Sequence, residues 1–180
     1  MNAADQRLAL IASSIRDVAD FPRPGVVFKD ITPLLASPQA YQASIEAMVD
    51  LAPERIDVVV GMEARGFVFA APVALKLGVG FVPVRKPGKL PRDVYSQTFD
   101  LEYGQDTLTV HQDAIRPGSR VLVIDDVLAT GGTIGATARL ISLLGAVLIH
   151  VVVLMELSFL AGRAHLEARG VGEVSAVLKV

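Results

Sequence analysis

The chain has 180 residues, and its 17 Lys and Arg against 19 Asp and Glu give a net charge of −2. This length corresponds to about one domain of ~150 residues, and the charge balance argues against a polybasic protein that binds nucleic acid or a membrane surface. The chain contains no Cys, which excludes disulfides, cysteine-based zinc sites and thiol catalysis. It shows neither an apolar run of ~18 residues, as a membrane span needs, nor a signal peptide, so we expect a cytoplasmic protein.

The N-terminal quarter of the chain is predicted to form two helices. Apolar residues recur at helical spacing over residues 3–18. The segment from Phe21 to Gly25 ends this helix because its two Pro residues and its Gly cannot continue it. Ser37 and Pro38 suit the start of a second helix, which should run to about Leu51.

The remainder of the chain alternates short β-branched runs with stretches of helical length. Predicted strands cover residues 56–60, 79–85, 120–124 and 147–155, and predicted helices cover residues 66–77 and 133–144. The strands are almost continuously apolar, which is typical of strands buried on both faces. The pattern predicts a doubly wound α/β fold, with a mostly parallel sheet and helices on both of its faces.

Residues 86–106 do not follow this alternation. They contain Pro87, Gly88 and Pro91 among scattered charges and show no clear helical period. A connection of this length is long for a compact domain, so the segment is predicted to be a lid or a hairpin. The chain has no internal repeat and no linker that would divide it, and we expect a single domain over residues 1–180.

The strand, loop and helix from Val121 to Thr133 carry the most specific chemical signal. The predicted strand ends in Asp125 and Asp126, and the loop Ala129-Thr-Gly-Gly-Thr133 precedes the next helix. Glycines let backbone N–H groups turn toward an anion, and the helix N-terminus adds partial positive charge there. Ionised carboxylates only accept hydrogen bonds, so they suit sugar hydroxyls or the water shell of Mg²⁺. Together these features describe a site for a ribose 5-phosphate.

The alternative for this segment is an ordinary strand, turn and helix with two solvated Asp side chains. The loop lacks the Gly-Lys-Ser/Thr sequence of a nucleotide-binding P-loop and the three glycines of a dinucleotide-binding loop. Among the His residues, His111, His150 and His165 have no metal-ligand spacing, and His150 is expected to be structural or to lie at an interface. Gly162, Arg163 and His165 are expected on a helix surface.

The strand with two acidic residues and its Thr-Gly-Gly-Thr loop resembles the motif of the type I phosphoribosyltransferases that binds phosphoribosyl pyrophosphate (PRPP). Four further segments are similar to members of this family that act on adenine, and the resemblance extends from about residue 7 to about residue 166. Val127 and Lys29 depart conservatively from the usual residues, Leu and Arg. The four segments are Phe21-Pro-Arg-Pro-Gly-Val-Val-Phe-Lys-Asp30, Gly61-Met-Glu-Ala-Arg-Gly-Phe67, Arg85-Lys-Pro-Gly-Lys-Leu-Pro91 and Leu101-Glu-Tyr-Gly104.

The resemblance implies which residues bind PRPP. Ala129, Thr130, Gly131, Gly132 and Thr133 would hold its 5-phosphate, and Asp125 and Asp126 its ribose hydroxyls. Glu63, Ala64 and Arg65 would bind the pyrophosphate, with a cis peptide between Glu63 and Ala64. Arg65 suits this role because a guanidinium can donate two hydrogen bonds to phosphate oxygens. A flexible lid over residues 86–106 would follow, and the cations where it begins, Arg85, Lys86 and Lys89, would bind the negative charge of the pyrophosphate. The alternative is that these three side chains lie on a solvated surface.

The resemblance also implies an adenine site in a small hood formed by residues 20–35 and 156–170. Phe28 would stack on the purine, the backbones of Val27 and Lys29 would contact its edge, and Leu157 would add an apolar contact. Without the resemblance, we would place Phe28 in the core. Glu102 would exchange a proton with a ring nitrogen of the base; its alternative is a solvated carboxylate.

Transfer of the phosphoribosyl group from PRPP to adenine is therefore the expected activity, with Glu102, Arg65, Asp125 and Asp126 as the catalytic residues. Mg²⁺ is expected to bind together with PRPP and water rather than in a cage of protein ligands. The small-molecule partners would be adenine and PRPP, with no nucleic acid or membrane, and the family implies a homodimer. Two alternatives stay open: a regulator that senses PRPP without catalysis, and a phosphoribosyltransferase for another base.

Overall fold

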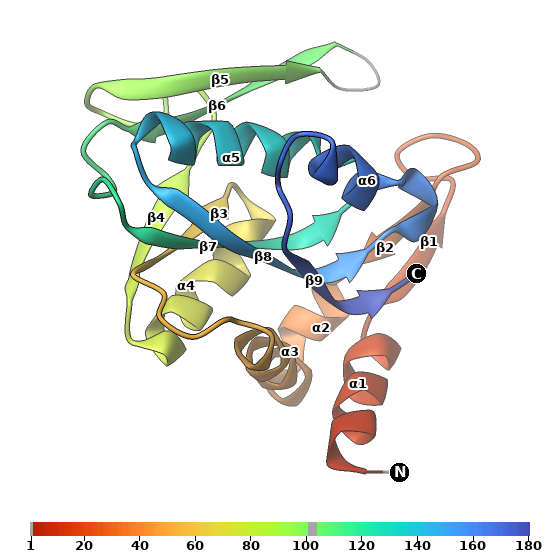
Figure 1. Ribbon diagram of the computed structural model, residues 1–180. Coiled ribbons are helices and arrows are strands. Elements are labelled where there is room, and N and C mark those ends of the chain that lie inside the picture. Colours follow the sequence, from red (N-terminus) through yellow and green to blue (C-terminus); the bar gives the residue numbers. More distant parts are fainter. Residues whose placement is uncertain (1, 101–103) are drawn as a thin grey trace. The chain divides into compact units, whose positions relative to one another are not determined.

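The computed structural model describes residues 2–100 and 104–180 of the chain (Figure 1). Its contacts divide it into two units, the first running to Ala47 and the second comprising Met48–Val180. The first unit contains a two-stranded sheet, β1–β2. The second contains a five-stranded sheet with the order β4-β3-β7-β8-β9 and a separate pair, β5–β6.

The first unit consists of α1 (Ala3–Ser13), an antiparallel hairpin of β1 (Arg16–Ala19) and β2 (Val27–Asp30), α2 (Thr32–Ala36) and most of α3 (Pro38–Asp50). The predicted helix over residues 3–18 is wrong at its C-terminal end, because residues 16–19 pair with β2 instead. Val18, which continues the helical spacing, lies opposite Phe28 in this hairpin. Pairing between strands outweighed the local pattern here.

The five strands of the large sheet are all parallel, which confirms the predicted α/β fold. The sheet contains β3 (Val58–Met62), β4 (Gly80–Val84), β7 (Arg120–Leu128), β8 (Val147–Glu156) and β9 (Val174–Lys179). Every residue of β3 is buried, and so are most residues of β7. This burial explains the continuous Val, Ile and Leu runs in the sequence. β9, an edge strand, was not predicted.

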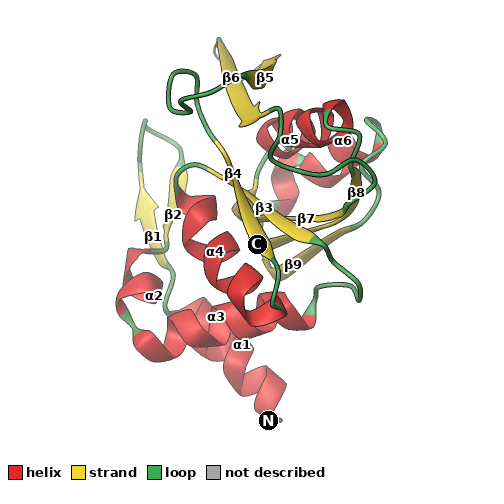
Figure 2. Ribbon diagram, turned by 90° about the vertical axis from the view of Figure 1, so that its left-hand side faces the viewer, coloured by secondary structure: helices red, strands yellow, loops and turns green. Residues whose placement is uncertain are grey.

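Helices cover both faces of this sheet, as predicted. Figures 1 and 2 show α4 (Arg65–Leu77) on one face and α5 (Gly132–Leu143) with α6 (Gly162–Glu167) on the other. Gly78 ends α4 in the left-handed conformation at φ 70°, which a glycine adopts without steric cost. The turns after β3 and β7 lead directly into α4 and α5, so the N-termini of both helices lie at the carboxyl edge of the sheet.

The segment after β4 forms a hairpin, one of the two structures expected of residues 86–106. β5 (Val94–Asp100) pairs antiparallel with β6 (Gln105–His111), and β6 extends beyond the predicted segment. The base of the hairpin is joined to the end of β4, because Arg85 and Thr109 exchange backbone hydrogen bonds of 2.9 and 2.7 Å. Tyr95 and Phe99 pack against the core of the second unit, so the two strands are anchored to it.

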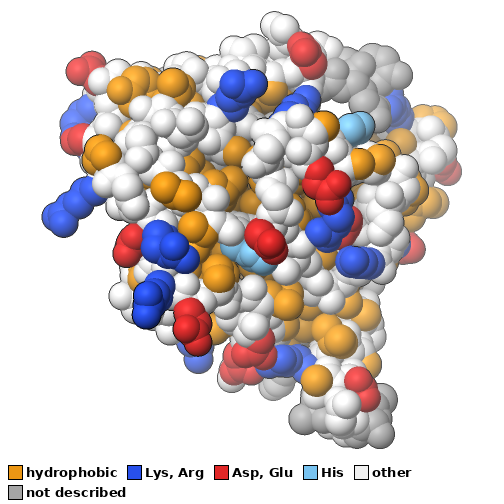
Figure 3. Space-filling model, in the orientation of Figure 1, with side chains coloured by type: hydrophobic (Ala, Val, Ile, Leu, Met, Phe, Trp, Pro, Cys, Tyr) orange, Lys and Arg blue, Asp and Glu red, His pale blue; other side chains and the backbone are white. Residues whose placement is uncertain are grey.

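Charged side chains of both signs are interspersed on the face of the molecule drawn in Figure 3. Within residues 2–100 and 104–180, every helix is too short or too polar to cross a bilayer.

Candidate active site

A pocket of about 240 Å³ opens at the carboxyl ends of β3 and β7. One wall is the turn from Met62 to Gly66, which leads from β3 into α4, and the other is the segment from Asp125 to Ile134, which leads from β7 into α5. In open α/β sheets, ligands bind at this edge because the loops and helix N-termini of neighbouring strands converge there. The pocket thus brings together two motifs that lie about 60 residues apart in the sequence.

The turn between β7 and α5 presents a row of unsatisfied backbone donors. Among the described residues, the N–H groups of residues 130–133 have no hydrogen-bond acceptor. Gly131 adopts φ 82° immediately before α5, a conformation that disfavours residues with a side chain. Free N–H groups at a helix N-terminus form a site for a phosphate or another anion. The geometry therefore supports the predicted phosphate-binding loop at Ala129, Thr130, Gly131, Gly132 and Thr133.

Asp125 and Asp126 lie within β7 rather than after it, which corrects the prediction that the strand ends at residue 124. Asp125 pairs with Val153 of β8, and the ladder continues to Leu128. The two carboxylates are therefore buried, with 8% and 4% of their residue surfaces exposed. The alternative of two solvated Asp side chains is wrong, because the sheet encloses them.

The two carboxylates are held in different ways. The Nε of Arg65 lies 2.8 Å from Oδ2 of Asp126, whereas Oδ1 of Asp125 accepts a hydrogen bond of 2.9 Å from the N–H of Asp126. Gly66 makes room for Asp125, because a Cβ there would lie 2.7 Å from its Oδ1. This close approach places Asp125 against the first turn of α4, whose N-terminus carries partial positive charge.

Burial raises the pKa of both carboxyl groups. The pKa of Asp125 lies well above its ordinary value, first because of burial and then because of the negative charge of Asp126. Burial also raises the pKa of Asp126, but the Arg65 guanidinium opposes that increase. A buried pair of this kind binds a proton more tightly than isolated carboxylates do. Both groups can accept hydrogen bonds from ribose hydroxyls when they are ionised.

The turn between β3 and α4 contains the expected cis peptide bond between Glu63 and Ala64. The carboxylate of Glu63 accepts a hydrogen bond of 2.8 Å from Nε of Arg85, at the end of β4. A second guanidinium nitrogen of Arg85 donates to the carbonyl of Lys89 at 3.2 Å, and Lys86 forms an ion pair of 3.0 Å with Asp106 of β6. Arg85 and Lys86 thus each have an acidic partner in the protein, while the side chain of Lys86 stays exposed.

The predicted adenine contacts fall in both units. In the first unit, Phe28 forms an edge-to-face pair with Phe21, with ring centroids 5.1 Å apart. Val27 is 52% exposed, and the ammonium group of Lys29 lies 2.7 Å from Asp17. In the second unit, the N–H of Leu157 donates to the carbonyl of Leu128. Glu102, the predicted proton-transfer residue, lies outside the described residues.

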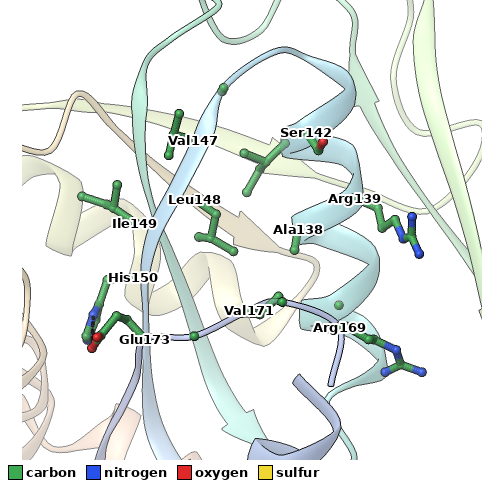
Figure 4. A pocket seen from close by; sticks show the side chains of 15 residues that line it. Ala138, Arg139, Ser142, Val147, Leu148, Ile149, His150, Arg169, Val171 and Glu173 are labelled. Atoms are coloured by element: carbon green, nitrogen blue, oxygen red, sulfur yellow. Dashed lines mark ion pairs between the residues drawn. The ribbon is translucent and has the colours of Figure 1, made fainter. Parts of the chain in front are cut away.

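A second pocket, of about 420 Å³, lies between α5, β8 and residues 169–173 (Figure 4). Leu148 and Ala138 point into it, while Arg139 and Arg169 extend away from its centre. His150 lies at its edge and contacts Ser175 at 3.0 Å; burial lowers its pKa. This pocket contains none of the predicted site residues.

Sequence reasoning missed residues that contact the phosphate-binding loop from elsewhere in the second unit. Gly162, Arg163 and His165 were expected on a helix surface, but Gly162 is buried and Arg163 is bonded to buried Glu156. His165 lies 3.1 Å from the carbonyl of Thr130. The phosphate-binding loop also packs against β5, because a Cβ at Gly132 would lie 3.1 Å from the Phe99 ring. No local pattern marks these residues, since their partners are distant in the sequence.

Residues 30–170 match the family model described as phosphoribosyl transferase domain. The chain therefore belongs to the phosphoribosyltransferase family, and the resemblance indicated by the sequence motifs is confirmed. A curated relative from Cutibacterium acnes, adenine phosphoribosyltransferase, is 67% identical over 97% of this chain and 98% of its own length. An adenine phosphoribosyltransferase from Escherichia coli is 52% identical over 98% of this chain and 97% of its own length.

Solved structures agree with these relatives. The adenine phosphoribosyltransferase from Thermoanaerobacter pseudethanolicus superposes with a TM-score of 0.91 at 46% identity, covering 96% of this chain and 99% of that chain. The enzyme from Saccharomyces cerevisiae, solved in complex with adenine and an imino-altritol bisphosphate, superposes with a TM-score of 0.89 at 37% identity over 97% of this chain and 99% of that chain. Both likenesses extend over nearly the whole fold.

Proposed function

We propose that this protein transfers the 5-phosphoribosyl group from PRPP to adenine, giving AMP and pyrophosphate in purine salvage. The observation that carries this function is the arrangement around the strand-end pocket. Free N–H groups for a phosphate lie on the turn after β7, and the last part of β7 itself carries two buried carboxylates for sugar hydroxyls. The curated relatives from Cutibacterium acnes and Escherichia coli are named adenine phosphoribosyltransferase, and they match this chain over nearly its whole length.

The reaction replaces pyrophosphate at the anomeric carbon of the ribose by a ring nitrogen of adenine. Positive charge develops on the sugar ring as the bond to pyrophosphate breaks. Asp125 and Asp126 bind the ribose hydroxyls and place negative charge beside the developing cation. The loop of residues 129–133 binds the 5-phosphate, which is remote from the breaking bond. Binding energy at this remote group orients the reacting carbon.

Arg65 has two roles in this proposal. Its guanidinium neutralises Asp126, at 2.8 Å, and Arg65 lines the pocket in which the pyrophosphate would bind. Glu63 and Ala64 add backbone groups on the same turn, while Arg85, Lys86 and Lys89 follow at the end of β4. Cations here stabilise the negative charge that accumulates on the leaving group.

Mg²⁺ is proposed to enter the site with PRPP. The described residues contain no group of three His, Asp or Glu side chains that could hold a metal ion by themselves. Asp125 and Asp126 nevertheless offer the carboxylate oxygens that suit the water shell of this hard cation. When bound, Mg²⁺ neutralises charge on the pyrophosphate group.

The remaining parts of the proposal concern the base and the assembly. Val27, Phe28, Lys29 and Leu157 would form the adenine site within the hood of residues 20–35 and 156–170. Glu102 would exchange the proton at the purine ring, under a lid formed by residues 86–106. We also propose that the 180 residues act as one domain, in a cytoplasmic homodimer.

The test is direct: purified protein is mixed with PRPP, Mg²⁺ and adenine, and AMP and pyrophosphate are measured together. We expect equal amounts of both products, with none when PRPP is omitted. Binding of PRPP without formation of AMP would instead identify a PRPP-sensing regulator. Product formation with a different base but not with adenine would identify a phosphoribosyltransferase of other specificity.

A further inference from the structure

The short helix α6 packs directly against the phosphate-binding loop of residues 129–133. Figure 1 shows α6 beside the N-terminal end of α5, where this loop lies. A Cβ on Gly131 would lie 3.0 Å from both the carbonyl of Gly162 and the side chain of Leu166. A Cβ on Gly162 would lie 2.1 Å from the carbonyl of Ala129. The loop and the helix are therefore in contact at a distance that only glycines on both sides allow.

His165 of α6 contacts the backbone of the loop. Its Nδ1 lies 3.1 Å from the carbonyl oxygen of Thr130. Because a carbonyl oxygen only accepts, Nδ1 carries the proton in this hydrogen bond. The contact thus restrains the peptide unit that joins Thr130 to Gly131.

Restraining that peptide unit also determines where one phosphate donor points. In a trans peptide, the C=O and the N–H lie on opposite sides of the unit. With the carbonyl of Thr130 directed toward His165, the N–H of Gly131 is directed away from α6. This N–H has no acceptor among the described residues, and Gly131 lines the strand-end pocket.

The helix that carries His165 is itself attached to the sheet. Arg163 donates two hydrogen bonds to the Glu156 carboxylate at the end of β8, at 3.1 and 2.6 Å, and a third to the carbonyl of Val174 in β9 at 2.6 Å. A guanidinium that uses three donors in this way has little freedom to move. The position of His165 is therefore tied to two strands rather than to a loose connection.

We propose that His165 is a positioning residue for the 5-phosphate of PRPP, acting through the carbonyl of Thr130 and the N–H of Gly131. The proposal rests on the proposed function, because it assigns a part to a residue outside the family motifs for the same substrate. It implies that loss of the hydrogen bond weakens binding of the phosphate end of PRPP. Binding of adenine and of pyrophosphate, and the rate of the chemical step, depend on other groups.

The experiment compares three variants with the wild type under the same conditions. His165→Ala removes the donor, and His165→Asn keeps an N–H at a similar position. Ala164→Gln is the control, because it changes an exposed neighbour on the same helix. For His165→Ala, we expect KM for PRPP to rise about three- to tenfold, the size of one lost hydrogen bond. The values of kcat and KM for adenine should stay within about twofold of those of the wild type.

Two competitive inhibitors locate the effect. Ribose 5-phosphate should lose affinity by the same factor as PRPP in His165→Ala, whereas inorganic pyrophosphate should bind as in the wild type. His165→Asn should recover most of the loss, and Ala164→Gln should match the wild type. An unchanged KM for PRPP, an equal loss for both inhibitors, or failure of Asn to recover the affinity would overturn the proposal. If the wild type forms no AMP, the proposed function has failed instead, which these outcomes distinguish.

Discussion

The strand-end pocket of the second unit and the β1–β2 hairpin of the first unit are built on different physical principles. At the pocket, Asp125 and Asp126 are buried, and acidic groups pair with arginines: Asp126 with Arg65, and Glu63 with Arg85. The hairpin has only four residues in each strand, and an aromatic pair of Phe21 and Phe28 with half-exposed Val27. One region holds fixed charges in a rigid sheet, whereas the other presents backbone edges and an aromatic ring.

This difference corresponds to the two substrates of the proposed reaction. A phosphorylated sugar with a pyrophosphate group needs donors and charges fixed in advance, because reorganising them during the reaction would raise the barrier. A flat, uncharged purine needs an aromatic face and a few hydrogen bonds at its edge. The comparison therefore predicts that substitutions in the pocket change PRPP binding and turnover. Substitutions in the hairpin should change binding of the base.

The largest expected effect concerns the choice of base. Hypoxanthine carries an oxygen where adenine carries an amine, so it would place that oxygen against backbone acceptors. Unpaired polar groups in a site of this kind discriminate by ~10⁴-fold. We expect kcat/KM for hypoxanthine to be lower than that for adenine by about this factor, measured with saturating PRPP. Similar kcat/KM values for the two bases would contradict the proposal that the backbones of Val27 and Lys29 recognise the edge of adenine.

The next effect separates activity from stability at Asp125. Asp125→Asn should lower kcat about 10- to 1000-fold, because a negative charge near the developing cation is lost. The same change should raise the melting temperature at pH 7, by about 2–4 °C for each kcal/mol gained. Steady-state kinetics and thermal unfolding of the same samples measure both quantities.

The pH dependence of that stability gain follows from the raised pKa of Asp125. The folded protein binds this proton more tightly than the unfolded chain does. The carboxyl group thus favours folding below the ordinary Asp pKa of ~3.9, and this contribution is lost as pH rises through the raised value. The advantage of Asn should therefore be present at pH 7 and fade toward pH 4. An Asn variant that is less stable than the wild type at pH 7 would contradict this account.

A smaller effect is expected at Phe28. Phe28→Leu should raise KM for adenine by roughly 5- to 100-fold, the range of one stacking contact with a base. KM for PRPP should stay close to the wild-type value, and Phe28→Tyr, which keeps the ring, should stay near the wild type for both substrates. If Phe28→Leu raised KM for PRPP as strongly as KM for adenine, the division between the two regions would be wrong.

The smallest effect concerns the Glu156–Arg163 pair of the second unit. Hydrogen bonds from Arg163 lower the pKa of Glu156, so the ionised carboxylate stabilises the fold above the unfolded pKa of ~4.3, and this stability is lost as pH falls through the lower folded value. Glu156→Gln should cost about 1–2 kcal/mol at pH 7, discounted because Arg163 is partly exposed. Urea unfolding should show this cost at pH 7 and a smaller one near pH 3. An equal cost at both values would assign the effect to packing rather than charge.

Much of the second unit could be predicted from local sequence. Strands β3, β7 and β8 were recognised because a parallel sheet covered on both faces requires continuous apolar runs. The loop of residues 129–133 could be predicted as a phosphate site because its glycines and the helix start that follows lie within a few residues of one another. Where the predictions failed, pairing with another strand decided the structure. Residues 16–19 pair with β2 instead of continuing α1, and β7 continues through Asp125 to Leu128 because it pairs with β8.

The amino-acid sequence by itself determined the class of fold, the family motifs and the types of group that we propose to bind PRPP, because each depends on residues close together in the chain. Only the tertiary structure decided the environment of those groups. It buried Asp125 and Asp126 within a strand, paired Arg65 with one of them, and placed His165 against the carbonyl of Thr130. Burial and long-range contacts depend on how the elements pack. These contacts determine the protonation and orientation of the side chains, whereas the sequence gives only their identity.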